Sequence, residues 1–595
     1  MIHFRINMNM KRVILLFIFI PFLFSCEGLW EPAIENIRDT ESLENEAVLA
    51  QTILGHAYLG NPLGGWSFND VATDDAVSND RTNQYMRIAT GQWRANNSPM
   101  NGNWQNRRGS LQYINLFLNM LDNVTFASEP VIDGMFKDRM TGDGHGMRAL
   151  FMYHLILEHA GFSDDGQLLG IPVLLMPETL ESDFNQSRNT LKECIDRIYA
   201  DVQVAVDNLP LRYANISNDA DVPAKYRNLN VTASEYMRVF SEANAGGRMD
   251  GLIAQAIRAQ ATLLAASPLY SAGTGITWEQ AANQMAIVLS SLGANPIAQI
   301  DPSGGTWYDN SEVNTLAGGR NPQEILWRGN VGDSRDLEED HFPPTLFGRG
   351  RLNPTQNLVD AFPMANGYPI TDAANSGYNP SNPFSGRDPR LERYIIVNGS
   401  TYKSVVITTA EDGTTNNALN RAETSTRTGY YMKKHLRPAV NADPSSPNTQ
   451  RHYKAFIRYT EIFLGYAEAA NEAWGPQGTG AHGFSAYDII KAIRTRAGIT
   501  GGDAYLESIK GDKDKMREMI HNERRLELCF EGHRFWDLRR WKEPITETAK
   551  GMRITGATYM PFDVEQRQYA EHMYHAPIPY SETLKFNNLK QNKGW

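Results

Sequence analysis

Apolar residues recur at helical spacing in many separate stretches of this 595-residue chain, and this periodicity constrains the fold more than any other feature. An apolar stripe of that period is buried only when the stretch forms a helix that packs against other elements. We therefore predict a mainly α fold. The predicted helices span residues 41–59, 111–121, 147–158, 190–208, 252–266, 278–292, 459–474, 487–497 and 513–530.

The helical spacing is lost between residues 294 and 440, where Gly, Asn and Pro interrupt short β-prone runs. Residues 325–327 and 403–408 are predicted to be two minor strands in this part. No Pro/Ser-rich linker or run of charge divides the chain. We therefore predict one domain. It comprises a helical part over 41–293, a loop-rich insertion with short strands over 294–440, and a C-terminal part over 441–595.

The N-terminus has the composition of an export signal. Lys11 and Arg12 precede an apolar run over residues 13–24. A permanent transmembrane helix needs about 20 apolar residues, and this run is shorter and is interrupted by Pro21. We expect residues 1–25 to be a signal peptide that is removed.

Ser25 and Cys26 follow the apolar run directly. A small residue before a cysteine at this place resembles the lipobox of bacterial lipoproteins, which implies that Cys26 carries the lipid anchor. Residues 26–40 would then form a tether. Phe24 is unusual at its position in such a motif, so ordinary secretion with a different cleavage site stays open.

The other two cysteines, Cys194 and Cys529, have apolar neighbours and are predicted to be small buried side chains. A single disulfide between them stays open. The net charge of −11 argues against nucleic acid as a partner, because phosphates need a basic surface. Neutral or cationic ligands fit this overall charge better.

The most specific segment is residues 522–541, NERRLELCFEGHRFWDLRRW, which closely resembles the signature of the SusD/RagB family. It covers a helix, a Gly stop and an aromatic-basic turn. Other stretches resemble landmarks of the same family in matching order. They are residues 148–154 with 170–172, 354–362, 387–391, 458–469, 493–498, and 578–579 through 591–595.

The resemblance implies a SusD-like scaffold of tetratricopeptide-like helical pairs with long irregular loops and minor short β-strands. It implies an outer-membrane lipoprotein of Bacteroidetes that faces the cell exterior. Such a protein would capture an oligosaccharide or polysaccharide and deliver it to a SusC-type TonB-dependent transporter, without a cofactor and without catalysis. A peptide or protein cargo, as in RagB-like members, is the alternative.

A secreted glycosidase is a third hypothesis, because Glu523, Glu527 and Glu531 fall at i, i+4 and i+8 on one helical face. Glycosidases use pairs of carboxylates. Neighbouring arginines such as Arg524 and Arg525 favour ion pairs instead, and consecutive helical turns leave little space for a sugar. We therefore predict no catalytic residue.

Searches for other chemistry find only weak patterns. The spacing His154-x-x-x-Glu158-His159 is one residue longer than that of the matching zinc motif. The glycines from Gly142 to Gly146 follow no predicted strand, so they indicate a turn before a helix and not a dinucleotide loop. No metal site is predicted.

A sugar-capture site needs exposed aromatic rings for stacking and polar side chains for hydrogen bonds. Two loop segments, residues 64–97 and 304–310, supply both kinds. For Trp66 and Trp93, packing on the scaffold or on the transporter is the alternative to stacking, whereas Trp104 and Trp327 are predicted to be core. The substrate-binding candidates are Trp66, Arg81, Tyr85, Trp93, Asn96 and Tyr308.

Overall fold

The computed structural model describes residues 46–317 and 319–595. The expected signal peptide (1–25), the lipidated Cys26 and the tether (26–40) lie outside the described residues. Among the helices that are described, none combines the length and the apolar character needed to cross a bilayer.

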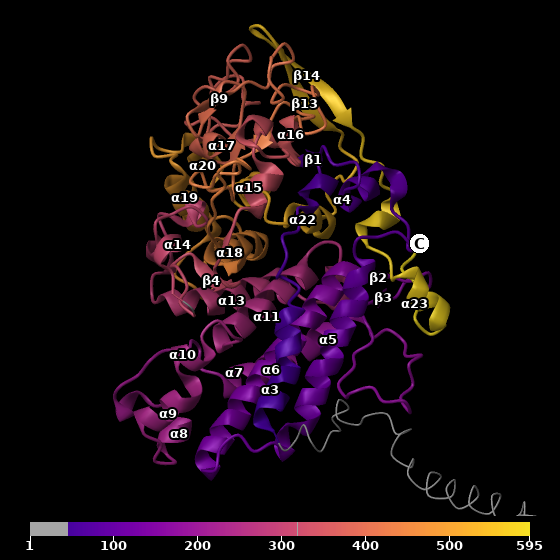
Figure 1. Cartoon of the computed structure of the whole chain (residues 1–595), viewed down its shortest axis with the longest axis vertical. Coiled ribbons are helices and arrows are strands. Elements are labelled where there is room, and N and C mark those ends of the chain that lie inside the picture. The colour runs from indigo at the N-terminus through magenta and orange to yellow at the C-terminus, as the bar shows by residue number, and fades with distance from the viewer. Residues whose placement is uncertain (1–45, 318) are drawn as a thin grey trace, which may run out of the picture.

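Each helix predicted from the periodicity is present, and the mainly α fold is confirmed. The long helices pack against one another in chain order. Helix α3 contacts α5, and each of α5, α6, α7, α11 and α13 contacts the next long helix along the chain, up to α18. Helix α18 also contacts α19 and α21. Figure 1 shows α3, α5, α6, α7, α11 and α13 as a layered array in the lower half of the molecule, with α18 and α19 above them. The long helices are α3 (Ala47–Leu59), α5 (Asn101–Met120), α6 (Pro130–His159), α7 (Leu191–Asn208), α11 (Gly251–Ala266), α13 (Trp278–Leu289), α18 (Tyr459–Trp474), α19 (Ala486–Ala497) and α21 (Lys513–Glu527).

The glycines from Gly142 to Gly146 lie inside α6, so the predicted turn was wrong. Glycine is a weak helix former, but here each lacks a side chain where a neighbouring side chain approaches closely. A Cβ added at Gly142 would lie 2.6 Å from Leu209 Cγ, and one at Gly146 would lie 2.4 Å from Met249 Cγ. The glycines therefore permit tight packing within one 30-residue helix.

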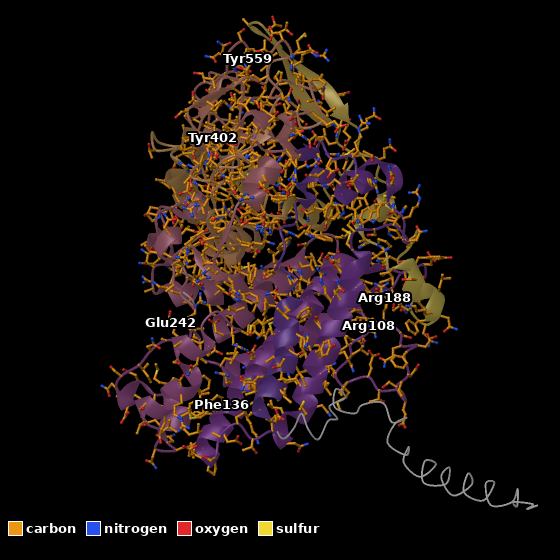
Figure 2. The ribbon with its side chains drawn as sticks, viewed as in Figure 1. Arg108, Phe136, Arg188, Glu242, Tyr402 and Tyr559 are labelled. Atoms are coloured by element: carbon orange, nitrogen blue, oxygen red, sulfur yellow. The ribbon has the colours of Figure 1, made fainter. Side chains whose placement is uncertain are left out.

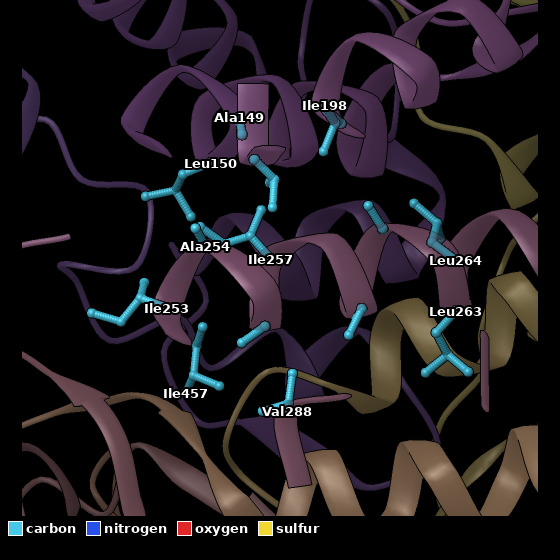
Figure 3. Close-up of a cluster of buried hydrophobic side chains, with 14 of the residues drawn as sticks. Ala149, Leu150, Ile198, Ile253, Ala254, Ile257, Leu263, Leu264, Val288 and Ile457 are labelled. Atoms are coloured by element: carbon cyan, nitrogen blue, oxygen red, sulfur yellow. The ribbon is translucent and has the colours of Figure 1, made fainter. Parts of the chain in front are cut away.

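The largest hydrophobic core is shared by helices from both parts of the sequence. It contains residues of α6, α7, α11 and α13 together with residues of α18, α19 and α21. Trp104 and Trp327 are confirmed as core residues, each 1% exposed. Figure 3 shows part of this core: Ala149, Leu150, Ile198, Ile253, Ala254, Ile257, Leu263, Leu264, Val288 and Ile457.

Arg188 joins the C-terminal segment to the helical layer. Its buried guanidinium donates to the carbonyls of His159, Gly170 and Lys590, and to Asn592 Oδ1 at 2.8 Å. Figure 2 shows Arg188 on the side of the molecule where this segment lies. An arginine that satisfies several carbonyls at once holds separate segments in a fixed arrangement.

The upper half is built from loops, short helices and two-stranded antiparallel ladders (Figure 1). Both predicted strands are present, as β4 (Ile325–Arg328) and β9 (Val405–Ile407). The ladders pair β1 (Ala76–Ser78) with β6 (Leu352–Pro354), β2 (Gly161–Phe162) with β3 (Leu168–Leu169), β4 with β12 (Ala455–Arg458), β5 (Gly332–Ser334) with β11 (Gln450–His452), β7 (Ile395–Ile396) with β10 (Tyr431–Met432), β8 (Ser400–Tyr402) with β9, and β13 (Ala549–Thr555) with β14 (Thr558–Glu565). Short helices include α4 (Gln84–Arg87), α8 (Ala224–Arg227), α9 (Ala233–Phe240), α15 (Asp336–His341), α16 (Gln356–Ala361), α17 (Pro389–Tyr394), α20 (Ala504–Ile509), α22 (Arg534–Trp541) and α23 (Tyr580–Lys585). Of these elements, α8, α9, α23 and the β2–β3 ladder lie in the lower half of the molecule (Figure 1).

Candidate ligand-binding cleft

Two adjoining cavities are lined by residues of the helical layer and of the loop-rich half. The inner cavity has a volume of about 620 Å³ and the outer cavity about 810 Å³. We call the two together the cleft. The residues that line both cavities are Trp66, Phe68, Asn83, Lys454 and Phe456.

The sequence signature forms one wall of the inner cavity. Helix α21 ends at Glu527, and the chain turns sharply through Phe530 and Gly532, both with positive φ, before α22 begins. The Phe530 N–H donates to Asp70 Oδ1 at 3.1 Å, which ties this turn to the N-terminal loops. Signature residues on the cavity wall are Arg524, Phe530, Glu531, Gly532, His533, Trp536, Asp537 and Arg540.

Glu523 and Glu527 are buried beneath this wall in a network of arginines. Arg390 Nη1 lies 2.7 Å from Glu523 Oε2 and 3.0 Å from Glu527 Oε1. Arg494 binds Glu523 at 2.7 Å, and Arg496 binds Glu527 at 2.8 Å. Burial alone would raise the pKa of the Glu527 carboxyl, but Arg496 and Arg390 overcome this and hold that pKa at about 2.

Glu531 lines the inner cavity and is also ion-paired. Its carboxylate lies 2.8 Å from Arg458 Nε and 2.6 Å from Lys434 Nζ. Burial opposes ionisation, yet these two cations lower the pKa of Glu531 well below its usual range. The predicted ion pairs of the three glutamates therefore exist, but their partners come from distant segments and not from the adjacent arginines.

Two of the adjacent arginines, Arg525 and Arg534, instead hold an N-terminal loop against the signature. Arg525 lies 2.8 Å from Asp74 and 2.6 Å from Asp75, and Arg534 lies 2.9 Å from Asp74. Charge-assisted bonds of this kind fix geometry as well as adding stability. They place the loop before Asp74, which carries Trp66, on the edge of the cleft.

Half-buried aromatic rings give the cleft surfaces on which a sugar could stack. Trp66 and Phe68 are nearly parallel, with centroids 5.9 Å apart and an interplanar angle of 6°. Tyr85, Phe456 and Trp536 also line the inner cavity. Phe68, Phe456 and Trp536 were missed from sequence, although Trp536 belongs to the signature and directly precedes the charged Asp537.

The structure separates the six predicted binding residues into three groups. Trp66 and Tyr85 line the cleft. Arg81 and Asn96 are exposed on loops but line neither cavity. The remaining two, Trp93 and Tyr308, are buried.

The expectation that Trp93 and Tyr308 are exposed was wrong. Trp93 is 0% exposed, its ring packs against Tyr569 and Trp595, and its Nε1 donates to Ser98 Oγ at 3.1 Å. Tyr308 is 7% exposed in a satellite core, where burial raises the pKa of its hydroxyl. Both rings are covered by protein and offer no face to a ligand.

Cys194 and Cys529 are both free and buried, so no disulfide joins them. Burial raises the pKa of each thiol to about 12. Thiols of this kind are inert, because the thiolate is the reactive form. The prediction that both behave as small buried side chains is confirmed.

Two family models cover most of the chain. Residues 323–595 match the model described as SusD family, and residues 32–226 match the model described as "Starch-binding associating with outer membrane". The chain belongs to the SusD/RagB family. The resemblance of the signature and of the other landmarks is thereby confirmed.

A curated SusD/RagB relative, SusD-like protein P2 of Formosa agariphila, is 27% identical over 166 residues. The match covers 27% of this chain and spans only 29% of that relative's length.

Several solved structures share the SusD fold. A SusD-like protein of Bacteroides fragilis has a TM-score of 0.68 at 22% identity, covering 95% of this chain and 100% of its own. A SusD-like carbohydrate-binding protein of the same species has a TM-score of 0.67 at 21% identity, covering 92% and 100%. Surface glycan-binding protein A of Bacteroides fluxus has a TM-score of 0.58 at 17% identity, covering 93% and 100%.

Proposed function

We propose that this protein is a glycan-binding protein whose cleft captures an oligosaccharide or a segment of a polysaccharide. The observation that carries the proposal is the pair of adjoining cavities with Trp66, Phe68 and Phe456 on the wall that both share. Apolar ring faces of sugars stack on aromatic side chains, and the polar residues of the cleft supply partners for hydroxyl groups. Two connected cavities suit a chain of several sugars better than a single sugar.

The family context extends the proposal. Two solved relatives are described as a carbohydrate-binding protein and a glycan-binding protein. The matched N-terminal model refers to association with the outer membrane. We propose that a lipid on Cys26 anchors the protein there, facing the cell exterior, and that it passes the glycan to a SusC-type TonB-dependent transporter.

A binding role fits the carboxylates of the signature better than a glycosidase role does. A glycosidase needs a carboxylic acid whose pKa is raised so that it can donate a proton to the leaving group. Arg390, Arg496, Arg458 and Lys434 have the opposite effect, because they stabilise the ionised forms of Glu527 and Glu531. We therefore propose no catalytic role for them.

Trp66→Ala tests the proposal in glycan-array and titration measurements on the purified protein. Loss of one stacking surface should weaken glycan binding by about tenfold, since an aromatic contact contributes about 1.5 kcal/mol at most beyond its buried area. Trp93→Phe is the matched control, because Trp93 is buried away from the cleft. It should leave glycan affinity unchanged.

Three outcomes would contradict the proposal. Absence of glycan binding by the wild-type protein is the first. Retention of peptides without retention of sugars would select the RagB-like alternative. Release of reducing sugar that disappears in Glu527→Gln would establish a glycosidase.

A further inference from the structure

Most charged side chains that line the inner cavity are neutralised by a neighbour of opposite charge. Arg458 pairs with Glu531 at 2.8 Å and Arg524 with Asp537 at 3.1 Å. Arg107 and Arg540 are likewise ion-paired, with Glu158 and Glu468 respectively. Of the cations and carboxylates on this wall that the structure describes, Lys454 and Glu461 have no ion-pair partner.

Glu461 has local compensation. It lies in the first turn of α18, where the positive end of the helix dipole stabilises a carboxylate. It also accepts a hydrogen bond from Gln260 Nε2 at 2.7 Å. Its negative charge therefore needs no ligand.

The positive charge of Lys454 has much less local compensation. Its ammonium donates to the carbonyl of Gly65 and lies 5.8 Å from the centroid of the Trp66 ring. Burial lowers the pKa of Lys454 to about 8, partly offset by the charge of Glu531. The side chain is thus a partly desolvated cation at neutral pH, and it stands on the wall shared by both cavities.

Two further donors on the inner cavity have no acceptor. Arg524 Nη1 and Trp307 Nε1 are buried and make no hydrogen bond among the described residues, with their side chains 3% and 2% exposed. Two acceptors on this wall, Asn69 Oδ1 and Glu158 Oε2, also make no hydrogen bond among the described residues, although Glu158 is ion-paired with Arg107.

We propose that the cleft selects glycans that carry an anionic group, a carboxylate or a sulfate ester, with Lys454 as the cation that binds it beside a sugar on Trp66. This inference rests on the proposed glycan-binding function. An unpaired, desolvated ammonium is costly, and an anion on the ligand would remove that cost. The net charge of −11 had favoured neutral or cationic ligands, but Lys454 places a cation without an ion-pair partner on the wall that both cavities share.

The test compares glycans that differ only in charge. Oligogalacturonate is titrated against its methyl ester, and a sulfated galactan oligosaccharide against its desulfated form. The wild-type protein should bind at least one charged member about tenfold more tightly than its neutral counterpart, as for a hydrogen bond to a charged group. The pair that shows the preference identifies carboxylate or sulfate.

Lys454→Gln should abolish this preference for the charged member. Lys454→Arg should keep most of it. Lys192→Gln is the matched control, because Lys192 is exposed on α7 and pairs there with Asp196. It should bind like the wild type.

The outcomes separate the two proposals. Equal affinity of the wild type for charged and neutral members would overturn the inference and leave glycan binding intact. So would a preference that persists in Lys454→Gln. Failure to bind any of these glycans or any other on an array would overturn glycan binding itself, and the inference with it. The wild-type comparison does not depend on whether a variant folds.

Discussion

Arg390→Met is the sharpest test of the buried charge network under the cleft. Arg390 is 0% exposed and lies within ion-pair distance of three carboxylates, Asp388 at 2.6 Å, Glu523 at 2.7 Å and Glu527 at 3.0 Å. Methionine fills a similar volume, so the substitution removes charge and hydrogen bonds with little change in packing. The network then holds buried carboxylates with too few cations.

The loss of stability in Arg390→Met depends on which of the three carboxylates keep an ion-pair partner. Glu523 retains Arg494 and Glu527 retains Arg496, whereas Asp388 loses its ion pair. Breaking a buried pair from one side costs about 3–5 kcal/mol of unfolding free energy. Because the unfolding entropy scales with chain length, this loss lowers Tm by about 2–4 °C for a chain of this size.

Thermal unfolding monitored by circular dichroism at a fixed scan rate measures the shift. The matched control is Arg238→Met, which breaks the exposed pair with Glu129 and should lower Tm much less, because exposed ion pairs contribute little to stability. Arg390→Met combined with Asp388→Asn should recover part of the loss, because the asparagine removes the unpaired charge and still caps α17. Equal shifts in the Arg390 and Arg238 variants, or a larger loss in the double variant, would refute the reasoning.

Two other predictions concern titratable groups. Burial and the nearby Asp75 raise the pKa of Asp70 to about 7. The folded state therefore retains a proton on Asp70 that the unfolded state releases above about pH 4. This contribution to stability is present at low pH and is lost as pH rises through 7. Asp70→Asn should therefore raise Tm relative to the wild type more at pH 8.5 than at pH 5, and a difference independent of pH would contradict the assignment. Cys194 and Cys529 should resist a thiol reagent in the folded protein and react fully in guanidinium, as measured by mass spectrometry of the labelled peptides; a disulfide between them in the native protein would contradict the structure.

The helices could be predicted from sequence because an apolar stripe carries its own period. Thr190 even provides the N-cap of α7 at the predicted start. The first half of α6 was missed, because three glycines in alternate positions indicate a turn until the neighbouring side chains that occupy the space beside them are known. Local sequence patterns therefore predicted the helices, but they did not explain why glycines occur inside α6.

The cleft was only partly predictable. Trp66 and Trp93 stand in similar loop sequences, yet one lines a cavity and the other is covered by Tyr569 and Trp595. Those covering residues lie more than 400 positions along the chain, and no spacing rule connects them. The ion-pair partners of Glu523 could not be predicted either, because pairing between distant segments depends on tertiary structure.

The salt bridges from the N-terminal loop to the signature also bear on the order of folding. Asp75 and Arg525 are separated by 450 residues, and Asp74 and Arg534 by 460. Closing loops of this length costs entropy that only the later contacts offset, so such pairs form late. The wall that carries Trp66 is therefore completed only when both distant segments have docked. Ligand binding then reports the fully assembled protein, and no contiguous fragment should reproduce it.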